Sequence, residues 1–145
     1  MVTLHIGVIE TKYADSKQAV GTGDVATWLE RRYGVLGGFV GAHSQDIADD
    51  LAASVKSQIT NLMLGSPTTD PFAQATQDIA TRAKQFISSG EAERVLAKGK
   101  PNPVPTQAAI DRKSSRIKSG KRSGPRPSFI DTGMYEGSLT AWVDE

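Results

Sequence analysis

Three side chains near the middle of the chain have the types and the spacing of a metal site. His43, Asp46 and Asp50 follow one another at intervals of three and four residues, which places them on one face of a helix. Imidazole and carboxylate groups bind divalent metals. Carboxylates in a first helical turn also stabilise the helix by complementing its macrodipole, and this accounts for the two acids without a ligand. We therefore expect no metal here.

A second candidate lies near the C-terminal end, where Phe129 and Ile130 precede Asp131, Thr132 and Gly133. Two apolar residues followed by Asp-Thr-Gly form the catalytic loop of aspartic proteases, in which two such aspartates share one proton. Only twelve residues follow Gly133, too few for the rest of a half-enzyme. The pattern therefore predicts a turn capped by Asp131 or Thr132 and beginning at Gly133.

The third candidate is a glycine pattern, Gly21-Thr-Gly-Asp-Val-Ala26, which matches the loose form of a dinucleotide-binding loop. The preceding apolar strand ends more than ten residues earlier and no strand–helix–strand unit follows, so we interpret the pattern as a turn that feeds a helix. The chain has two histidines and no cysteine, and no nucleophile–base set stands out. We expect no catalytic residue, no cofactor and no enzymatic activity.

The net charge of +1 conceals an uneven distribution. Residues 1–99 carry nine bases and eleven acids, whereas residues 100–145 carry eight bases and five acids. Seven of those bases fall within fifteen residues that contain no acid: Arg112, Lys113, Arg116, Lys118, Lys121, Arg122 and Arg126. Such a run binds a phosphate backbone by counterion release. The alternatives, a solvated loop or contact with an acidic neighbour, stay open, and the lack of interleaved aromatics excludes base-specific recognition.

The surrounding elements follow from periodicity. Alternation over residues 2–10 predicts a strand, and Asp24 stands where it would cap a short helix that Gly34 ends. The glycine-rich residues 34–41 are expected to form a flexible connection. Apolar spacings of three and four predict an amphipathic helix over residues 44–64, and a second begins at Pro71 and ends at Gly90. Residues 91–97 could add a turn of helix.

The last third of the chain differs in composition. Three prolines between residues 101 and 105 predict an extended spacer, which Thr106 ends by capping a basic helix over residues 107–118. Residues 139–143 alternate as a closing strand. The expected fold is α+β: a small mixed or antiparallel sheet packed with two long amphipathic helices, plus the basic helix and an extended C-terminal segment. We expect a single domain over residues 1–145, with residues 99–127 as an arm.

Two separated patterns suggest a family. The first is Ile6-Gly-Val-Ile-Glu10 with Tyr13-Ala14, Asp24-Val-Ala26-Thr-Trp28 and Tyr33-Gly34. The second is Pro105-Thr-Gln-Ala-Ala-Ile-Asp-Arg-Lys113 followed by Arg126-Pro-Ser-Phe-Ile-Asp-Thr-Gly-Met-Tyr-Glu-Gly-Ser138. Together they resemble the tail-completion and head-tail joining proteins of long-tailed bacteriophages, the virion-morphogenesis group. The chain departs from that group in ending before a hairpin that some members have, and in carrying Arg31-Arg32 where an acidic residue is usual.

The resemblance implies a structural virion protein of the phage neck or tail end. It implies a ring of identical subunits, a hexamer, which encloses the channel for double-stranded DNA and contacts neighbouring neck, portal-adaptor or tail-tube proteins. In that assembly the basic run faces DNA or an acidic neighbour, and an interface or core is expected to contain Phe129, Ile130, Leu139 and Trp142. The protein would reside in the virion, and in the host cytoplasm during assembly.

The alternative function is a monomeric accessory protein that binds nucleic acid without sequence preference through the basic arm. No run of residues approaches the ~20 apolar positions that a membrane-spanning helix needs, and no signal peptide begins the chain, so no membrane partner is expected.

Overall fold

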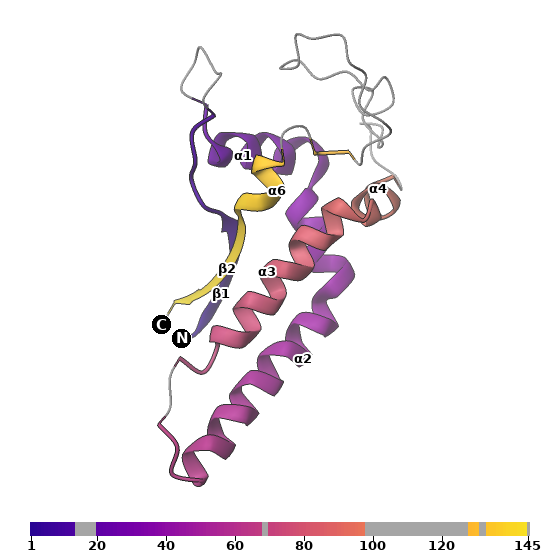
Figure 1. Ribbon diagram of the computed structural model, residues 1–145. Coiled ribbons are helices and arrows are strands. Elements are labelled where there is room, and N and C mark those ends of the chain that lie inside the picture. The colour runs from indigo at the N-terminus through magenta and orange to yellow at the C-terminus, as the bar shows by residue number, and fades with distance from the viewer. Residues whose placement is uncertain (14–19, 68–69, 98–127, 131–132, 145) are drawn as a thin grey trace.

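The computed structural model describes residues 1–13, 20–67, 70–97, 128–130 and 133–144. In chain order the described elements are β1 (Thr3–Val8), α1 (Thr22–Tyr33), α2 (Val35–Met63), α3 (Ala73–Ser88), α4 (Glu91–Leu96), α6 (Met134–Ser138) and β2 (Leu139–Asp144). Strands and helices are mixed, so the α+β class is confirmed (Figure 1). The predicted basic helix and most of the arm lie outside the described residues.

The sheet of the described residues joins the two ends of the chain. β1 and β2 pair antiparallel, from Val8 opposite Leu139 to Thr3 opposite Asp144, and the two termini lie side by side in Figure 1. Directly paired residues share a face of the sheet. The apolar side chains of β1 pack against the core, and across the pairing Leu139 and Ala141 are buried in it. Both predicted strands are therefore confirmed.

The two long helices form an antiparallel pair, and α3 lies between the sheet and α2 (Figure 1). This position explains why α3 has the most regular buried stripe: Ala75, Ile79, Ala83, Phe86 and Ile87. The rings of Phe39 on α2 and Phe86 on α3 have centroids 5.6 Å apart. Burial of each of these two phenylalanine side chains stabilises the domain by about 2 kcal/mol or more.

The expected flexible connection over residues 34–41 is wrong, because residues 35–41 form the first turns of α2 and Gly34 is its N-cap. Val35 and Phe39 are both buried and hold the segment against the core. A Cβ on Gly38 would lie 2.5 Å from Leu96 Cδ2, so that glycine lets α4 approach closely. Tertiary packing thus outweighs the poor helix propensity of glycine. His43, with φ −117° and ψ 17°, then kinks α2.

The helix starts also differ in detail from the predicted ones. α1 begins at Thr22 with Gly21 as its N-cap residue, and Asp24 instead accepts a hydrogen bond from the Gly21 amide at 3.1 Å. α3 begins at Ala73 rather than at Pro71, because the Asp70 carboxylate accepts the Phe72 amide at 2.8 Å in a turn just before the helix. Both carboxylates thus act at the residues just before or within the first turn of their helices, Asp24 close to its predicted position.

Candidate assembly surfaces

The residues of the candidate metal set contact protein side chains around the kink of α2. His43 Nδ1 lies 3.0 Å from Asp46 Oδ2, while His43 Nε2 approaches Glu91 Oε1 on α4 at 3.2 Å without the alignment of a hydrogen bond. Asp50 instead accepts a hydrogen bond from Arg82 Nη2 on α3 at 2.8 Å. The three candidate side chains therefore do not form a metal-binding group among the described residues, and the cluster ties three helices together.

The hydrogen bonds and charges of this cluster explain the shifted pKa values of two of its side chains. The hydrogen bond from His43, with the nearby Arg82 guanidinium, holds the pKa of Asp46 below its usual value. The hydrogen bond to Asp50 raises the pKa of Arg82, so this guanidinium stays charged. Both shifts are those of a structural ion-pair network.

The glycine pattern at the start of α1 is occupied by carboxylates of the same chain. Glu10 Oε2 accepts the Gly23 amide at 2.8 Å, and a Cβ on Gly21 would overlap the Glu10 carboxylate. The buried Thr22 hydroxyl donates to the Ile9 carbonyl at 2.6 Å and accepts the Thr11 amide at 2.9 Å. The two glycines thus leave room for the Glu10 carboxylate at the N-terminus of α1, which is the position where a dinucleotide-binding loop would hold a phosphate.

The C-terminal candidate residues divide between the core and the surface. Phe129 has a positive φ of 72° and packs edge-on against Tyr33, with centroids 5.2 Å apart. Ile130 is half-buried against the core, and Gly133, at φ 77°, precedes α6. Asp131, Thr132 and all seven residues of the basic run lie outside the described residues.

The face of the sheet turned away from the core carries an exposed aromatic side chain. Trp142, 42% exposed, stacks on the His5 ring with centroids 5.2 Å apart. His5 Nε2 also approaches Asp144 Oδ2 at 3.2 Å. A Cβ on Gly7 would lie 3.2 Å from the Trp142 ring, so the glycine leaves room for the indole. Leu139, by contrast, is buried in the core.

Both edges of the sheet lack a strand partner among the described residues. The Ile9 amide donates to the Ser138 carbonyl at 2.8 Å just beyond the paired register. Because antiparallel pairs alternate between bonded and non-bonded, this bond assigns the outward-pointing amides to Leu4, Ile6 and Val8 on β1 and to Ala141 and Val143 on β2. Each edge therefore offers backbone donors and acceptors to another strand.

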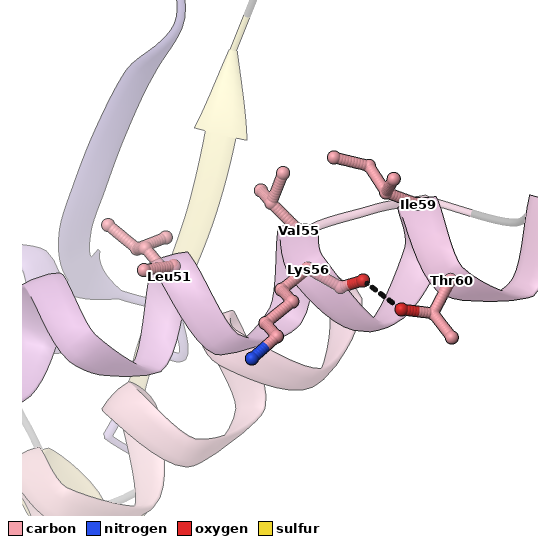
Figure 2. A pocket seen from close by; sticks show the side chains of 6 residues that line it. Leu51, Val55, Lys56, Ile59 and Thr60 are labelled. Atoms are coloured by element: carbon pink, nitrogen blue, oxygen red, sulfur yellow. Dashed lines mark hydrogen bonds between the residues drawn. The ribbon is translucent and has the colours of Figure 1, made fainter.

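A third surface lies on the second half of α2. Leu51, Val55 and Ile59 project from the same side of the helix and line a shallow apolar groove, with Lys56 beside them (Figure 2). Ile59 is 55% and Leu62 64% exposed. The periodicity that predicts this helix does not distinguish a stripe that its own chain covers from one that it leaves open, because both have the same spacing.

The candidate residues that the structure describes do not come together in one ligand-binding site. The features that stand out are instead three surfaces: the unpaired sheet edges, the exposed Trp142 and the apolar groove on α2. In the described residues, no helix is long and apolar enough to cross a membrane. No protein-family model, curated protein or solved structure matches the chain.

Proposed function

We propose that the chain is a structural subunit of the bacteriophage neck or tail end, acting in tail completion or head-tail joining as a ring around the DNA channel. The sequence resemblance motivates the proposal, and the packing of the described parts of its two patterns supports it. The opening pattern contributes β1 and α1, the closing one contributes α6, and α1 contacts α6. The two ends of the chain thus form one unit.

The observation that carries the proposal is the two-stranded sheet, both of whose edges are unpaired in the described part of the chain. The unpaired backbone groups of a sheet edge are a template for another strand. The β1 edge and the β2 edge are different surfaces on opposite sides of the same sheet. Pairing the β1 edge of one copy with the β2 edge of the next is a head-to-tail contact, which generates a ring when the rotation closes.

The exposed Trp142 lies on this sheet and extends the contact beyond the backbone. Its ring and the stacked His5 ring present apolar area beside both edges. Aromatic side chains are enriched at protein interfaces because they bury large areas. The interface role expected for Trp142 from the sequence is therefore retained in the proposal.

In the proposed ring, the basic run is repeated around the DNA channel. Each copy repeats the seven bases, so a hexamer would present them six times to DNA in the channel or to acidic neighbours. Contacts with phosphates alone position DNA without reading its sequence, as a channel requires.

The test is the mass of the purified protein by light scattering, with negative-stain images of the same sample. We expect a closed ring, formed alone or after addition of tail tubes or portal-bearing capsids. Val143→Pro removes an outward-pointing amide donor from the β2 edge, and Val143→Ala is the matched control that keeps it. Loss of the ring only in the proline variant, with unchanged circular dichroism, supports the edge contact. Equal assembly of both variants contradicts it.

The monomeric nucleic-acid-binding alternative makes a different prediction. Reversing the charges of Lys121 and Arg122 should abolish DNA binding by a monomer, whereas a ring held by the sheet edges keeps its mass. A protein that stays monomeric with tail tubes and capsids, and that loses DNA binding in this variant, would favour the alternative.

A further inference from the structure

The exposed face of α2 has the spacing of a helix-pairing seam. Its members follow one another at intervals of four, three, four and three residues, which is the heptad pattern of a coiled coil. We call them the α2 seam: Ala48, Ala52, Val55, Ile59 and Leu62. All are exposed except Val55, which is half-buried.

The described part of the chain covers the other side of this helix. Ile47 is buried in the core, Asp50 bonds to Arg82 on α3, and the Ser54 hydroxyl donates to the Pro71 carbonyl at 2.7 Å. At about 100° per residue, these three residues lie about 100° to 160° around the helix from the middle of the seam. Among the described residues, nothing covers the four exposed members of the seam, so they can accept another helix.

We propose that the seam binds the α2 helix of a second copy, antiparallel, about a two-fold axis between residues 53 and 54. In this register Ala48 lies opposite Ile59 of the second copy, and Ala52 lies opposite its Val55. Each of these layers joins a small residue to a β-branched one, which fills the space between two closely spaced helices. Four of the five seam residues thus complement one another, and Leu62 lies opposite Gln45 of the second copy.

The charges beside the seam select the same register. Asp49 and Lys56 both flank the seam on the same side, at the position that faces its own equivalent in an antiparallel pair. The two-fold axis places Asp49 of each copy beside Lys56 of the other, so two opposite-charge contacts form. An antiparallel register shifted by one heptad step would bring the two Lys56 side chains together. A parallel pair would place neither charge near an opposite one.

This contact is distinct from the proposed ring. A two-fold contact pairs copies and cannot close a cyclic ring by itself, whereas the sheet-edge contact is head-to-tail. The inference therefore does not rest on the proposed function, and the two contacts respond to different substitutions. Because the seam has only five members, we expect a small interface and a dissociation constant of roughly micromolar or weaker.

The experiment is sedimentation velocity of the full chain in the Val143→Pro background, at concentrations from about 1 µM to about 1 mM. Asp49→Lys and Lys56→Asp each bring like charges together twice, and we expect each to weaken dimerisation about tenfold or more. The double substitution Asp49→Lys with Lys56→Asp restores opposite pairs and should recover the dimer. Ser57→Lys, on the opposite side of α2, is the control and should leave the dimer unchanged.

The outcomes separate the proposal from other arrangements. A monomer at every concentration overturns it, and so does a dimer that is insensitive to both single reversals. A dimer weakened by each reversal but not recovered by the double substitution overturns the antiparallel register. A ring that is lost in Val143→Pro while the dimer persists leaves both contacts in place as separate surfaces.

Discussion

Glu30 is the residue through which the start of α2 can be tested most directly. Its carboxylate accepts hydrogen bonds from the amides of Leu36 at 2.7 Å and Gly37 at 3.1 Å. These amides belong to the first turn of α2, where the N-cap Gly34 has no side chain to satisfy them. Glu30→Ala removes both acceptor oxygens, and Glu30→Gln keeps one oxygen without the charge.

The expected loss follows from the two bonds and the helix dipole. Replacing a capping side chain by alanine costs about 1 kcal/mol, and a carboxylate at a helix N-terminus contributes up to about 1 kcal/mol more. We expect Glu30→Ala to lower the free energy of unfolding by about 2 kcal/mol and Glu30→Gln by about 1 kcal/mol. For a domain of this size the alanine variant should melt about 6 °C lower.

The assay is urea unfolding followed by circular dichroism, together with amide hydrogen exchange. Exchange at Gly37 and Gly38 should speed up more than exchange in α3 if the start of α2 frays. Arg31→Ala, an exposed neighbour on the same helix, is the control for helix propensity. A loss below about 0.5 kcal/mol in Glu30→Ala, or equal losses in Ala and Gln variants, would refute the capping argument.

Three further predictions concern side chains on other elements. The buried Tyr135 hydroxyl has no hydrogen-bond partner in the described part of the chain and its desolvation raises the pKa, so Tyr135→Phe should stabilise the protein by about 1 kcal/mol in urea unfolding. It should also reduce the loss of stability above about pH 10, where tyrosine ionises in the unfolded chain but not in the folded one. Because the pKa of Asp46 is lowered in the folded protein, its ionised form stabilises the fold above the unfolded value of about 3.9, and this stabilisation is lost as the pH falls through the lower pKa of the folded state. In thermal melts, Asp46→Asn should therefore destabilise the protein near neutral pH, and its difference from the unsubstituted protein should shrink as the pH falls below that unfolded value. Trp142 is half-exposed and stacks on His5, so Trp142→Ala should cost about 1 kcal/mol of folding free energy, less than the roughly 3–5 kcal/mol of a fully buried aromatic. Light scattering should show that the same substitution weakens assembly more than it weakens folding.

Periodicity predicted the elements whose burial is regular. The stripe from Ala75 to Ile87 repeats every three or four residues because α3 has neighbours on two sides, so its apolar residues must recur at helical spacing. The alternation of Leu4, Ile6 and Val8 predicted β1 for the same reason. In these elements local pattern and tertiary burial agree.

The start of α2 could not be predicted from composition, because its stability comes from partners distant in the sequence. The glycines between residues 34 and 41 disfavour a helix locally, and nothing in the segment reveals that Glu30 caps it or that Leu96 packs on Gly38. The exposed half of α2 is the converse case. Its spacing predicts an apolar face, but only the position of α3 shows that the described residues leave this face exposed.

The pairing of the first and last strands has a consequence during synthesis. Thr3 pairs with Asp144, so the ribosome adds nearly the whole chain after Thr3 before this pair can form. At about 5–20 residues per second, β1 waits on the order of ten seconds for its partner strand. Meanwhile α2 and α3 can already pack on each other, because both helices are synthesised well before β2. The nascent chain therefore exposes an unpaired apolar strand throughout elongation, and a chaperone that holds extended apolar segments would shorten the time in which β1 pairs with another chain.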